Sequence, residues 1–240
     1  MTLVLERKMR VLVFPCGTEI GLEIHRSLCQ SSHAELFGAN SVEPNHGAFV
    51  FKNYGPLFPM VYDPLFLPEI ISFVKEHHID FIYPAHDDVQ LVLSRHAEDL
   101  GCELIGAPRE TCELCRSKAA TYARFAKGIP VPALYESLDS SAPFPLFLKP
   151  DRGEGSRGVL LVNSLAEWAA ALAADASLIS MEYLPGAEYT VDCFTDRHGG
   201  LRFAGARERV RTLGGISMHT RPVRDEDFRK TAVAINEALD

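Results

Sequence analysis

Apolar and polar positions alternate in a regular way over the first 108 residues. Short apolar runs are followed by stretches in which apolar residues recur at helical spacing. The runs predict strands at residues 10–15, 34–39, 81–84 and 102–105, and the helical spacing predicts helices ending near Leu28 and at 69–77 and 89–100. Strands that alternate with helices are typical of a parallel sheet covered on both faces. Residues 1–108 therefore predict a doubly wound α/β domain.

The pattern changes after Pro108. Two helical pieces lead to a stiff connector, Gly128-Ile129-Pro130-Val131-Pro132, and short apolar runs then dominate. Predicted strands lie at 145–150, 159–162, 178–183, 188–195 and 201–209, and predicted helices at 109–114, 118–127, 165–174 and from Arg221 onward. Residues after Arg211 otherwise read as loop. This order predicts an α+β domain over residues 109–240 with antiparallel sheet.

Composition narrows the functional classes. The 240 residues contain Lys+Arg 24 and Asp+Glu 32, for a net charge of −8, which argues against a broad grip on nucleic acid but permits a local basic pocket for a small anion. No apolar run reaches the roughly 18 residues of a membrane span, and the N-terminus lacks the charge order of a signal peptide. Cys112-x-x-Cys115 is the only close pair among the 6 cysteines, and without a second Cys or His pair at zinc spacing it favours helix packing over a metal site. We therefore expect reduced thiols and a cytoplasmic protein.

A glycine-rich segment, Gly153-Glu154-Gly155-Ser156-Arg157-Gly158, is the most prominent motif. A dinucleotide fingerprint needs a helix after the loop, but the apolar run at 159–162 predicts a strand. We therefore expect a hairpin lid whose backbone N–H groups approach phosphate oxygens. A merely flexible hairpin turn is the alternative.

Charged residues near this loop add candidates for binding a nucleotide. Lys149 ends an apolar strand, where a buried ammonium needs an anionic partner, although a lysine that snorkels to solvent is the alternative. Glu182 and Glu188 flank the Pro185-Gly186 turn. Either could accept hydrogen bonds from an adenine amino group or from ribose hydroxyls, and a pair of solvated loop glutamates is the alternative.

Five short motifs occur in one order: Lys118 at a helix start, the 128–132 connector, Phe147-Leu148-Lys149-Pro150, the glycine loop, and residues 182–192. Together they resemble the ATP-grasp superfamily, and most closely the ATP-binding region of carbamoyl-phosphate synthetase large chains and related carboxylate–amine ligases. The resemblance covers nearly the whole chain. It implies a pre-ATP-grasp domain at 1–108, a glycine-loop lobe at about 115–184 and the start of a second lobe at 185–240.

The resemblance implies a reaction in which ATP phosphorylates a small carboxylate and an amine or similar nucleophile attacks the acyl phosphate. Lys118 and Lys149 would hold the α- and β-phosphates, and Glu182 would meet the adenine amino group. Glu188 would take the ribose hydroxyls. The remaining implied nucleotide-binding residues are the loop residues Gly153, Glu154, Gly155, Ser156 and Gly158, and the hinge residues Tyr183 and Leu184.

Three arginines lie in a predicted strand before Gly214-Gly215. Strict alternation would place Arg207, Arg209 and Arg211 on one face. The resemblance implies an arginine that faces the transferred phosphate or the substrate carboxylate, and Arg209 is our candidate. At least one of the three could belong to a solvated charge ladder, and we expect His219 to be structural.

A separate candidate lies in the first domain. His86, Asp87 and Asp88 follow the strand at 81–84, at the edge where α/β sheets place ligand contacts. We expect Asp87 or Asp88 to cap the next helix, because aspartate is a favoured N-cap. Substrate binding is the alternative.

The sequence departs from the family in its metal ligands. The resemblance implies Mg²⁺ held by acidic residues and a Glu-x-Asn motif, and these are not found, so the metal residues stay unknown. We expect a chain that is incomplete at its C-terminus, that binds nucleotide weakly if at all, and that is inactive alone. A homodimer is a possible assembly.

Other functional classes remain to be weighed. The missing metal ligands also fit a non-catalytic nucleotide-binding or sensing module. An NAD-dependent oxidoreductase is disfavoured because residues 16–21 lack the full G-x-G-x-x-G, and a protein kinase because His-Arg-Asp and Asp-Phe-Gly are absent.

Overall fold

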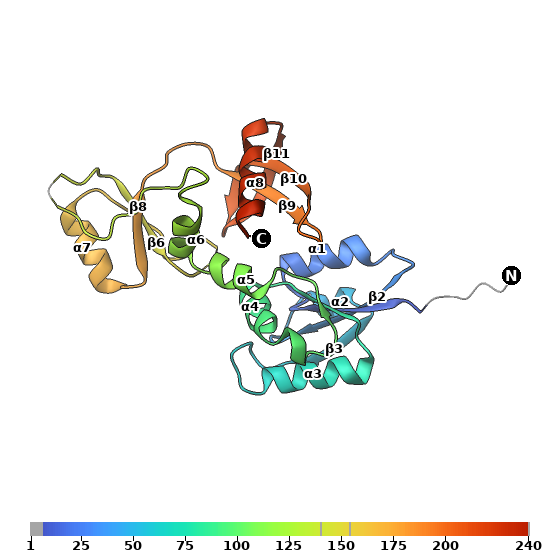
Figure 1. Cartoon of the computed structure of the whole chain (residues 1–240). Helices are drawn as coiled ribbons and strands as arrows, with labels where there is room; N and C mark the ends of the chain where they lie inside the picture. The colour runs from blue at the N-terminus through green and yellow to red at the C-terminus, as the bar shows by residue number, and fades with distance from the viewer. Residues whose placement is uncertain (1–6, 140, 154, 240) are drawn as a thin grey trace. The chain divides into compact units, whose positions relative to one another are not determined.

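The computed structural model describes residues 7–139, 141–153 and 155–239. The chain forms two compact units, Met1–Glu113 and Leu114–Asp240 (Figure 1). The boundary predicted after Pro108 falls in the loop that precedes the helix at Arg109–Cys115. Within the described residues, no helix combines the length and the apolar character needed to cross a membrane.

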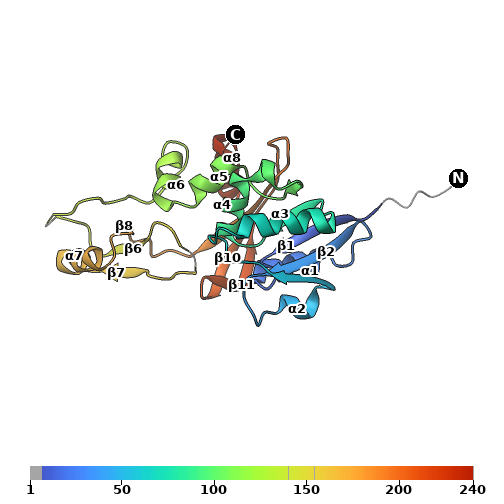
Figure 2. The same cartoon turned by 90° about the horizontal axis from the view of Figure 1, so that it is seen from below.

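The first unit is built on a five-stranded parallel sheet in the order β3-β2-β1-β4-β5. Its strands are β1 (Met9–Phe14), β2 (Ala34–Asn40), β3 (Asn53–Leu57), β4 (Phe81–Pro84) and β5 (Glu103–Leu104). Its helices are α1 (Glu19–Leu28), α2 (Gly47–Val50), α3 (Phe66–His77), α4 (Asp87–Arg95) and α5 (Arg109–Cys115), with a 3₁₀ turn at Ala97–Asp99. Helices α1 and α3 cover opposite faces of the sheet (Figure 1), and α3 lies in front of the sheet in the view of Figure 2. This confirms the predicted doubly wound architecture.

Each face of the parallel sheet has its own hydrophobic core. Leu12 and Phe14 of β1 pack on the α3 side, whereas Val13 packs with Ile24 of α1 on the other side. This alternation follows from the two-residue period of a strand. Because β1 is central and covered on both faces, its residues 11–14 form a continuous buried apolar run.

The sequence analysis missed helix α2 and strand β3 of this unit and assigned the N-cap of α4 to the wrong residue. Strand β3 contains a glycine and a proline, which weaken the strand pattern and are tolerated because β3 is an edge strand. The expectation that Asp87 or Asp88 caps α4 was wrong. The Nδ1 atom of His86 accepts from the backbone N–H of Asp88 at 3.2 Å, and both aspartates lie in the first helical turn.

The second unit contains two three-stranded antiparallel sheets, as the predicted α+β class requires. The first sheet has the order β7-β6-β8, with its core at Leu146, Leu148, Val162 and Leu178. Trp168 packs against this core and donates a hydrogen bond from Nε1 to the Ser180 hydroxyl at 2.7 Å. The elements are α6 (Lys118–Phe125), β6 (Leu146–Pro150), β7 (Leu160–Val162), α7 (Leu165–Ala174) and β8 (Leu178–Glu182).

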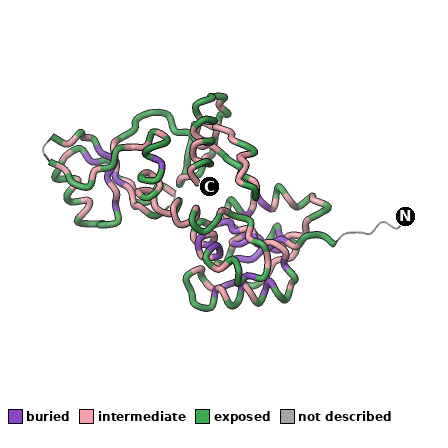
Figure 3. The backbone as a smooth tube through the Cα atoms, in the orientation of Figure 1, coloured by how far each residue is buried: buried purple, intermediate pink, exposed green. Residues whose placement is uncertain are grey.

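The second sheet has the order β11-β10-β9, and helix α8 contacts β9 and β10. Its elements are β9 (Tyr189–Thr195), β10 (Leu201–Leu213), β11 (Ile216–Val223) and α8 (Glu226–Leu239). The prediction of loop between Arg211 and Arg221 was wrong, because β11 occupies most of that segment. Polar residues interrupt the apolar ones along β11, so the sequence shows no clear apolar run there. The strand is largely exposed (Figure 3).

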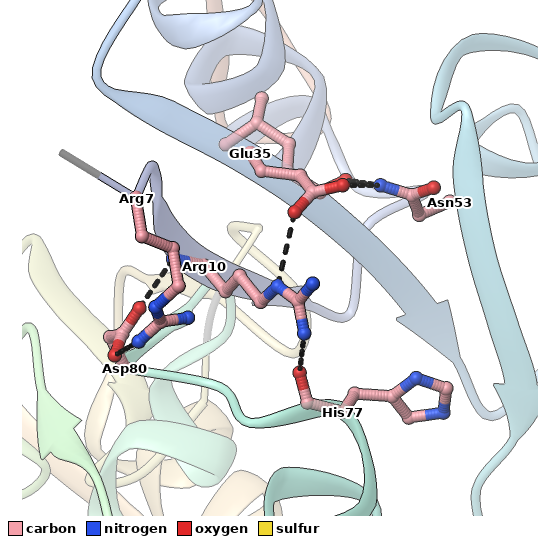
Figure 4. A network of polar contacts seen from close by, with 7 residues as sticks. Arg7, Arg10, Glu35, Asn53, His77 and Asp80 are labelled. Atoms are coloured by element: carbon pink, nitrogen blue, oxygen red, sulfur yellow. Dashed lines mark hydrogen bonds and ion pairs between the residues drawn. The ribbon is translucent and has the colours of Figure 1, made fainter. Parts of the chain in front are cut away.

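A polar network ties the start of β1 to the segment between α3 and β4 (Figure 4). The Asp80 carboxylate accepts from the backbone N–H of Arg10 at 2.7 Å and from the Arg7 guanidinium at 2.6 Å. Burial raises the pKa of the Asp80 carboxyl, but the Arg10 N–H and the Arg7 guanidinium together outweigh burial and hold that pKa below its usual value. The charged form of Asp80 therefore stabilises the folded unit.

Replacing Asp80→Asn tests this contribution. We expect the free energy of unfolding at pH 7 to fall by about 0.5–1 kcal/mol, because the ion pair with the exposed Arg7 guanidinium is lost and solvent screens such a pair. Since the folded-state pKa is lowered, the charged form stabilises above about pH 4 and this effect is lost as pH falls further. The difference between variant and wild type should therefore shrink in acid, measured by urea unfolding from pH 3 to 7. The exposed Glu76→Gln variant is the control, and an equal, pH-independent loss in both variants would contradict the assignment.

Candidate functional site

One carboxylate joins the start of α6 to the end of β6. The Oδ1 atom of Asp151 accepts from the Ser117 hydroxyl at 3.1 Å and from the Ala119 backbone N–H at 2.8 Å. Ser117 in turn caps the helix, because its hydroxyl accepts from the Ala120 N–H at 3.1 Å. Hydrogen bonds at a helix N-terminus satisfy backbone donors that have no partner within the helix. The Asp151 side chain thereby holds the first turn of α6 against the segment that leads into the glycine loop.

Lys118 lies at the entrance of the glycine loop. Its backbone N–H donates to the Asp151 carbonyl at 3.2 Å, and its Nζ donates to the carbonyls of Asp151 and Gly153, each at 3.1 Å. The structure therefore places this predicted phosphate-binding lysine beside the loop that it was expected to serve.

Lys149 lies on the same side of the lobe. Its Nζ donates to the Tyr122 hydroxyl at 2.7 Å and stands 5.2 Å from the centre of the Tyr122 ring. Tyr122 follows Lys118 by four residues, so both side chains lie on one face of α6. Helix α6 thus presents Lys118 and Tyr122 together, and Tyr122 brings Lys149 to that face. Sequence reasoning missed Tyr122 and Asp151, although the four-residue spacing and the aspartate after Lys149-Pro150 were visible.

The glycine loop connects two paired strands. Strands β6 and β7 pair antiparallel, with Leu146 opposite Val162, which confirms the predicted hairpin. Positive φ angles occur at Gly153 (139°), Gly155 (70°), Ser156 (56°) and Gly158 (70°). Glycine adopts such angles without steric cost, whereas Ser156 is unusual in doing so. Glu154, the remaining predicted residue of this loop, lies outside the described residues.

A second glycine turn approaches the loop closely. A Cβ atom at Gly215, in the β10–β11 turn, would lie 2.6 Å from the Cα atom of Gly155. A Cβ atom at Gly155 would lie 3.3 Å from the Gly214 carbonyl oxygen. The two backbones therefore meet without intervening side chains.

Arg209 links that turn to Glu188. Its guanidinium donates to the Gly215 carbonyl, to the Ser217 hydroxyl at 2.8 Å and to the Glu188 carboxylate. The side chain of Arg209 is 18% exposed. Two predicted site residues, Arg209 and Glu188, are therefore direct partners, and Arg209 also braces the turn that meets the glycine loop.

The other two arginines differ from Arg209. Arg207 forms a two-bond ion pair with Asp192, at 2.7 and 3.0 Å. The register of β10 with β11 shifts between Arg209 and Arg211, which interrupts the alternation that was expected to put all three arginines on one face. Arg211 is exposed, as is His219 opposite it on β11.

Glu182, the last residue of β8, is hydrogen-bonded, whereas the two hinge residues that follow it are exposed. The Glu182 carboxylate accepts from the Ala133 N–H at 3.0 Å, and the Glu182 N–H donates to the Ala133 carbonyl at the same distance. The adjacent Tyr183 and Leu184 are 42% and 59% exposed. The structure thus pairs Glu182 with the segment after the 128–132 connector and leaves the next two residues open to solvent.

A candidate metal centre is absent from the part of the chain that the structure describes. No group of three or more His, Cys, Asp or Glu side chains there is arranged to hold an ion. No disulfide links the cysteines that the structure describes.

The fold is similar to several solved ligase structures. The chain superposes on N5-carboxyaminoimidazole synthetase from Staphylococcus aureus with a TM-score of 0.74, 13% identity, and coverage of 97% of this chain and 63% of that one. For the biotin carboxylase domain of 2-oxoglutarate carboxylase from Hydrogenobacter thermophilus, the TM-score is 0.73, identity is 16%, and coverage is 97% and 58%. For L-amino acid ligase from Bacillus licheniformis, the values are 0.71, 17%, 97% and 60%.

These likenesses, all below 25% identity, show a shared fold, and the chain spans less than two thirds of each of these three proteins. No curated protein matches the sequence. The model of the ATP-grasp domain family matches residues 115–239, which include both antiparallel sheets, the glycine loop and Arg209. Since this match covers more than half of the chain, the protein belongs to the ATP-grasp family.

Proposed function

We propose that the chain is the nucleotide-binding part of an ATP-dependent ligase that activates a carboxylate as an acyl phosphate for attack by an amine. The observation that carries this proposal is the gathering of two lysines at helix α6 beside the glycine loop: Lys118 contacts the loop backbone, and Lys149 contacts Tyr122 on the same helix face. Two lysines beside a loop rich in backbone N–H donors form a surface suited to phosphate groups. Membership of the ATP-grasp family supports the same function.

Each residue receives a role from its chemistry. Lys118 and Lys149 bind the α- and β-phosphates, and the amides of Gly153, Gly155, Ser156 and Gly158 close over them. Glu182 meets the adenine amino group with the hinge backbone of Tyr183 and Leu184, and Glu188 accepts from the ribose hydroxyls. Arg209 faces the transferred phosphate. When bound, ATP supplies the phosphoryl group that makes a carboxylate reactive.

Binding of a nucleotide fits these side chains, whereas binding of Mg²⁺ finds no matching donor set. Lysine ammonium groups and loop amides donate hydrogen bonds to phosphate, and carboxylates accept them from hydroxyl and amino groups. The described residues hold no three-ligand group for a cation. No described residue is therefore assigned to Mg²⁺, although one similar structure, the biotin carboxylase domain, contains MgADP.

The substrate is proposed only as a class. That same biotin carboxylase structure also contains bicarbonate, and another similar structure is an L-amino acid ligase, so both kinds of small carboxylate are represented among similar folds. Carbamoyl-phosphate synthase-like use of bicarbonate is one form of the proposal. A cytoplasmic location and a homodimer stay predictions from the sequence.

A second candidate is a nucleotide-binding module without catalysis. The lack of a metal-ligand group among the described residues favours it. Both candidates require the residues that bind the phosphates. A ligase also requires a positively charged side chain, here Arg209, directed at the terminal phosphate that is transferred.

Lys149→Ala tests the nucleotide site. By isothermal titration with a non-hydrolysable ATP analogue, we expect an affinity at least about tenfold weaker than in wild type, because a charge-assisted contact to phosphate is lost. Lys127→Ala removes an equal charge from an exposed position beyond the end of α6 and should leave the affinity unchanged.

Equal losses in both lysine variants would mean that the analogue senses only net charge, which would contradict the assigned site.

Arg209→Gln distinguishes the two candidate functions. If the chain is part of a ligase, we expect the variant to bind the triphosphate analogue about tenfold more weakly than wild type does. Its affinity for ADP should fall less than about threefold, because Arg209 contacts the terminal phosphate. Exposed Arg211→Gln is the matched control. Since Arg209 also holds Glu188 and the Gly215 turn, an equal loss for both nucleotides would assign it a structural role and favour the non-catalytic module.

A further inference from the structure

A second basic site lies in the first unit, at the opposite edge of the parallel sheet from its ligand-binding edge. A cavity of about 500 Å³ opens there, lined by Arg7, Lys8, His25, Lys52 and Glu35 among others. Lys8 immediately precedes β1 and Lys52 immediately precedes β3. Because the strand order is β3-β2-β1, the two lysines flank the start of β2.

The acidic groups around this cavity are already engaged. Glu35, the one acidic residue in the described lining, accepts from Arg10 Nε at 3.1 Å and from Asn53 Nδ2 at 3.4 Å (Figure 4). Asp80 takes the guanidinium of Arg7 at 2.6 Å. Among the residues that the structure describes, neither Lys8 nor Lys52 forms an ion pair. The cavity thus keeps two ammonium groups that no described carboxylate neutralises.

This arrangement does not follow from the overall charge or from the nucleotide site. The chain carries a net charge of −8, so an excess of cations around one cavity, with no described carboxylate paired to Lys8 or Lys52, is opposite in sign to the charge of the chain as a whole. The edge also differs from the one that parallel α/β sheets use for ligands, which is at the carboxyl ends of the strands. The proposed nucleotide-binding residues all belong to the other unit.

We propose that this cavity binds a phosphate group, with the ammonium groups of Lys8 and Lys52 as its main donors. A phosphate dianion supplies two negative charges and several acceptor oxygens, which match two lysines that pair with no described carboxylate. The cavity volume leaves room for a small organic group attached to the phosphate. The ligand class is therefore inorganic phosphate or a small phosphate monoester.

Nuclear magnetic resonance titration of the whole chain tests the proposal, with inorganic phosphate and glycerol phosphate as probes. We expect saturable shifts at the amides of Cys29 and Ala34–Leu36, which line the cavity, with a dissociation constant of roughly 1–10 mM, as expected for two charge-assisted contacts. Lys8→Gln and Lys52→Gln should each weaken binding by about three- to tenfold. Tighter binding of glycerol phosphate identifies the monoester as the better ligand, and equal binding identifies the phosphate group alone.

Lys75→Gln, which removes an exposed charge from α3 of the same unit, is the matched control and should bind as wild type does. Three results would overturn the proposal: no saturable shift at Ala34–Leu36, equal weakening in the control variant, or shifts confined to Gly155–Gly158. The last result would place phosphate only at the proposed nucleotide site, so this proposal can fail while the proposed function stands.

Discussion

The Asp151 carboxylate is the contact on which the geometry of the candidate site depends. It accepts from Ser117 and Ala119 at the start of α6, while its own backbone leads from β6 into the glycine loop. Together with the hydrogen bonds from Lys118 to the Asp151 and Gly153 carbonyls, this link joins two segments that are far apart in the sequence. An aspartate that accepts hydrogen bonds at a helix N-terminus also benefits from the positive end of the helix dipole. Local capping chemistry therefore sets the position of a lysine proposed to bind phosphate.

A second chain of contacts extends from the loop to the other sheet of the same unit. Gly155 meets Gly215 backbone to backbone, Gly215 accepts from Arg209, and Arg209 pairs with Glu188. Side chains at either glycine would separate the two turns, so the absence of a Cβ atom is what permits the approach. The same arginine thus joins the turn below the loop to the carboxylate proposed for the ribose. Because Arg209 holds both the Gly215 turn and Glu188, the effect of a substitution there has to be compared between nucleoside diphosphate and triphosphate.

Much of this arrangement was visible in the sequence because it depends on local patterns. The apolar run after Gly158 distinguished a hairpin from a dinucleotide fingerprint, and the alternation of strands and helices predicted the parallel sheet. Most of the predictions that were wrong, and the contacts that were missed, depend on tertiary context. Strand β11 is largely exposed and has few apolar residues. The cap of α4 is a local exception, because the His86 ring takes the place expected for an aspartate. Tyr122 carried no motif, and its contact with Lys149 arises only when α6 packs against β6. The register shift before Arg211 likewise leaves no mark in residue spacing.

Hydrogen–deuterium exchange with and without a non-hydrolysable ATP analogue tests the central claim most directly, namely that the glycine-loop lobe holds the nucleotide phosphates. The account predicts slower exchange at the amides of Gly155–Gly158 and at the hinge residues Tyr183 and Leu184, because the former close over phosphate and the latter meet the adenine. Saturating analogue that leaves these amides unchanged, or that protects only residues of the first unit, would contradict the claim.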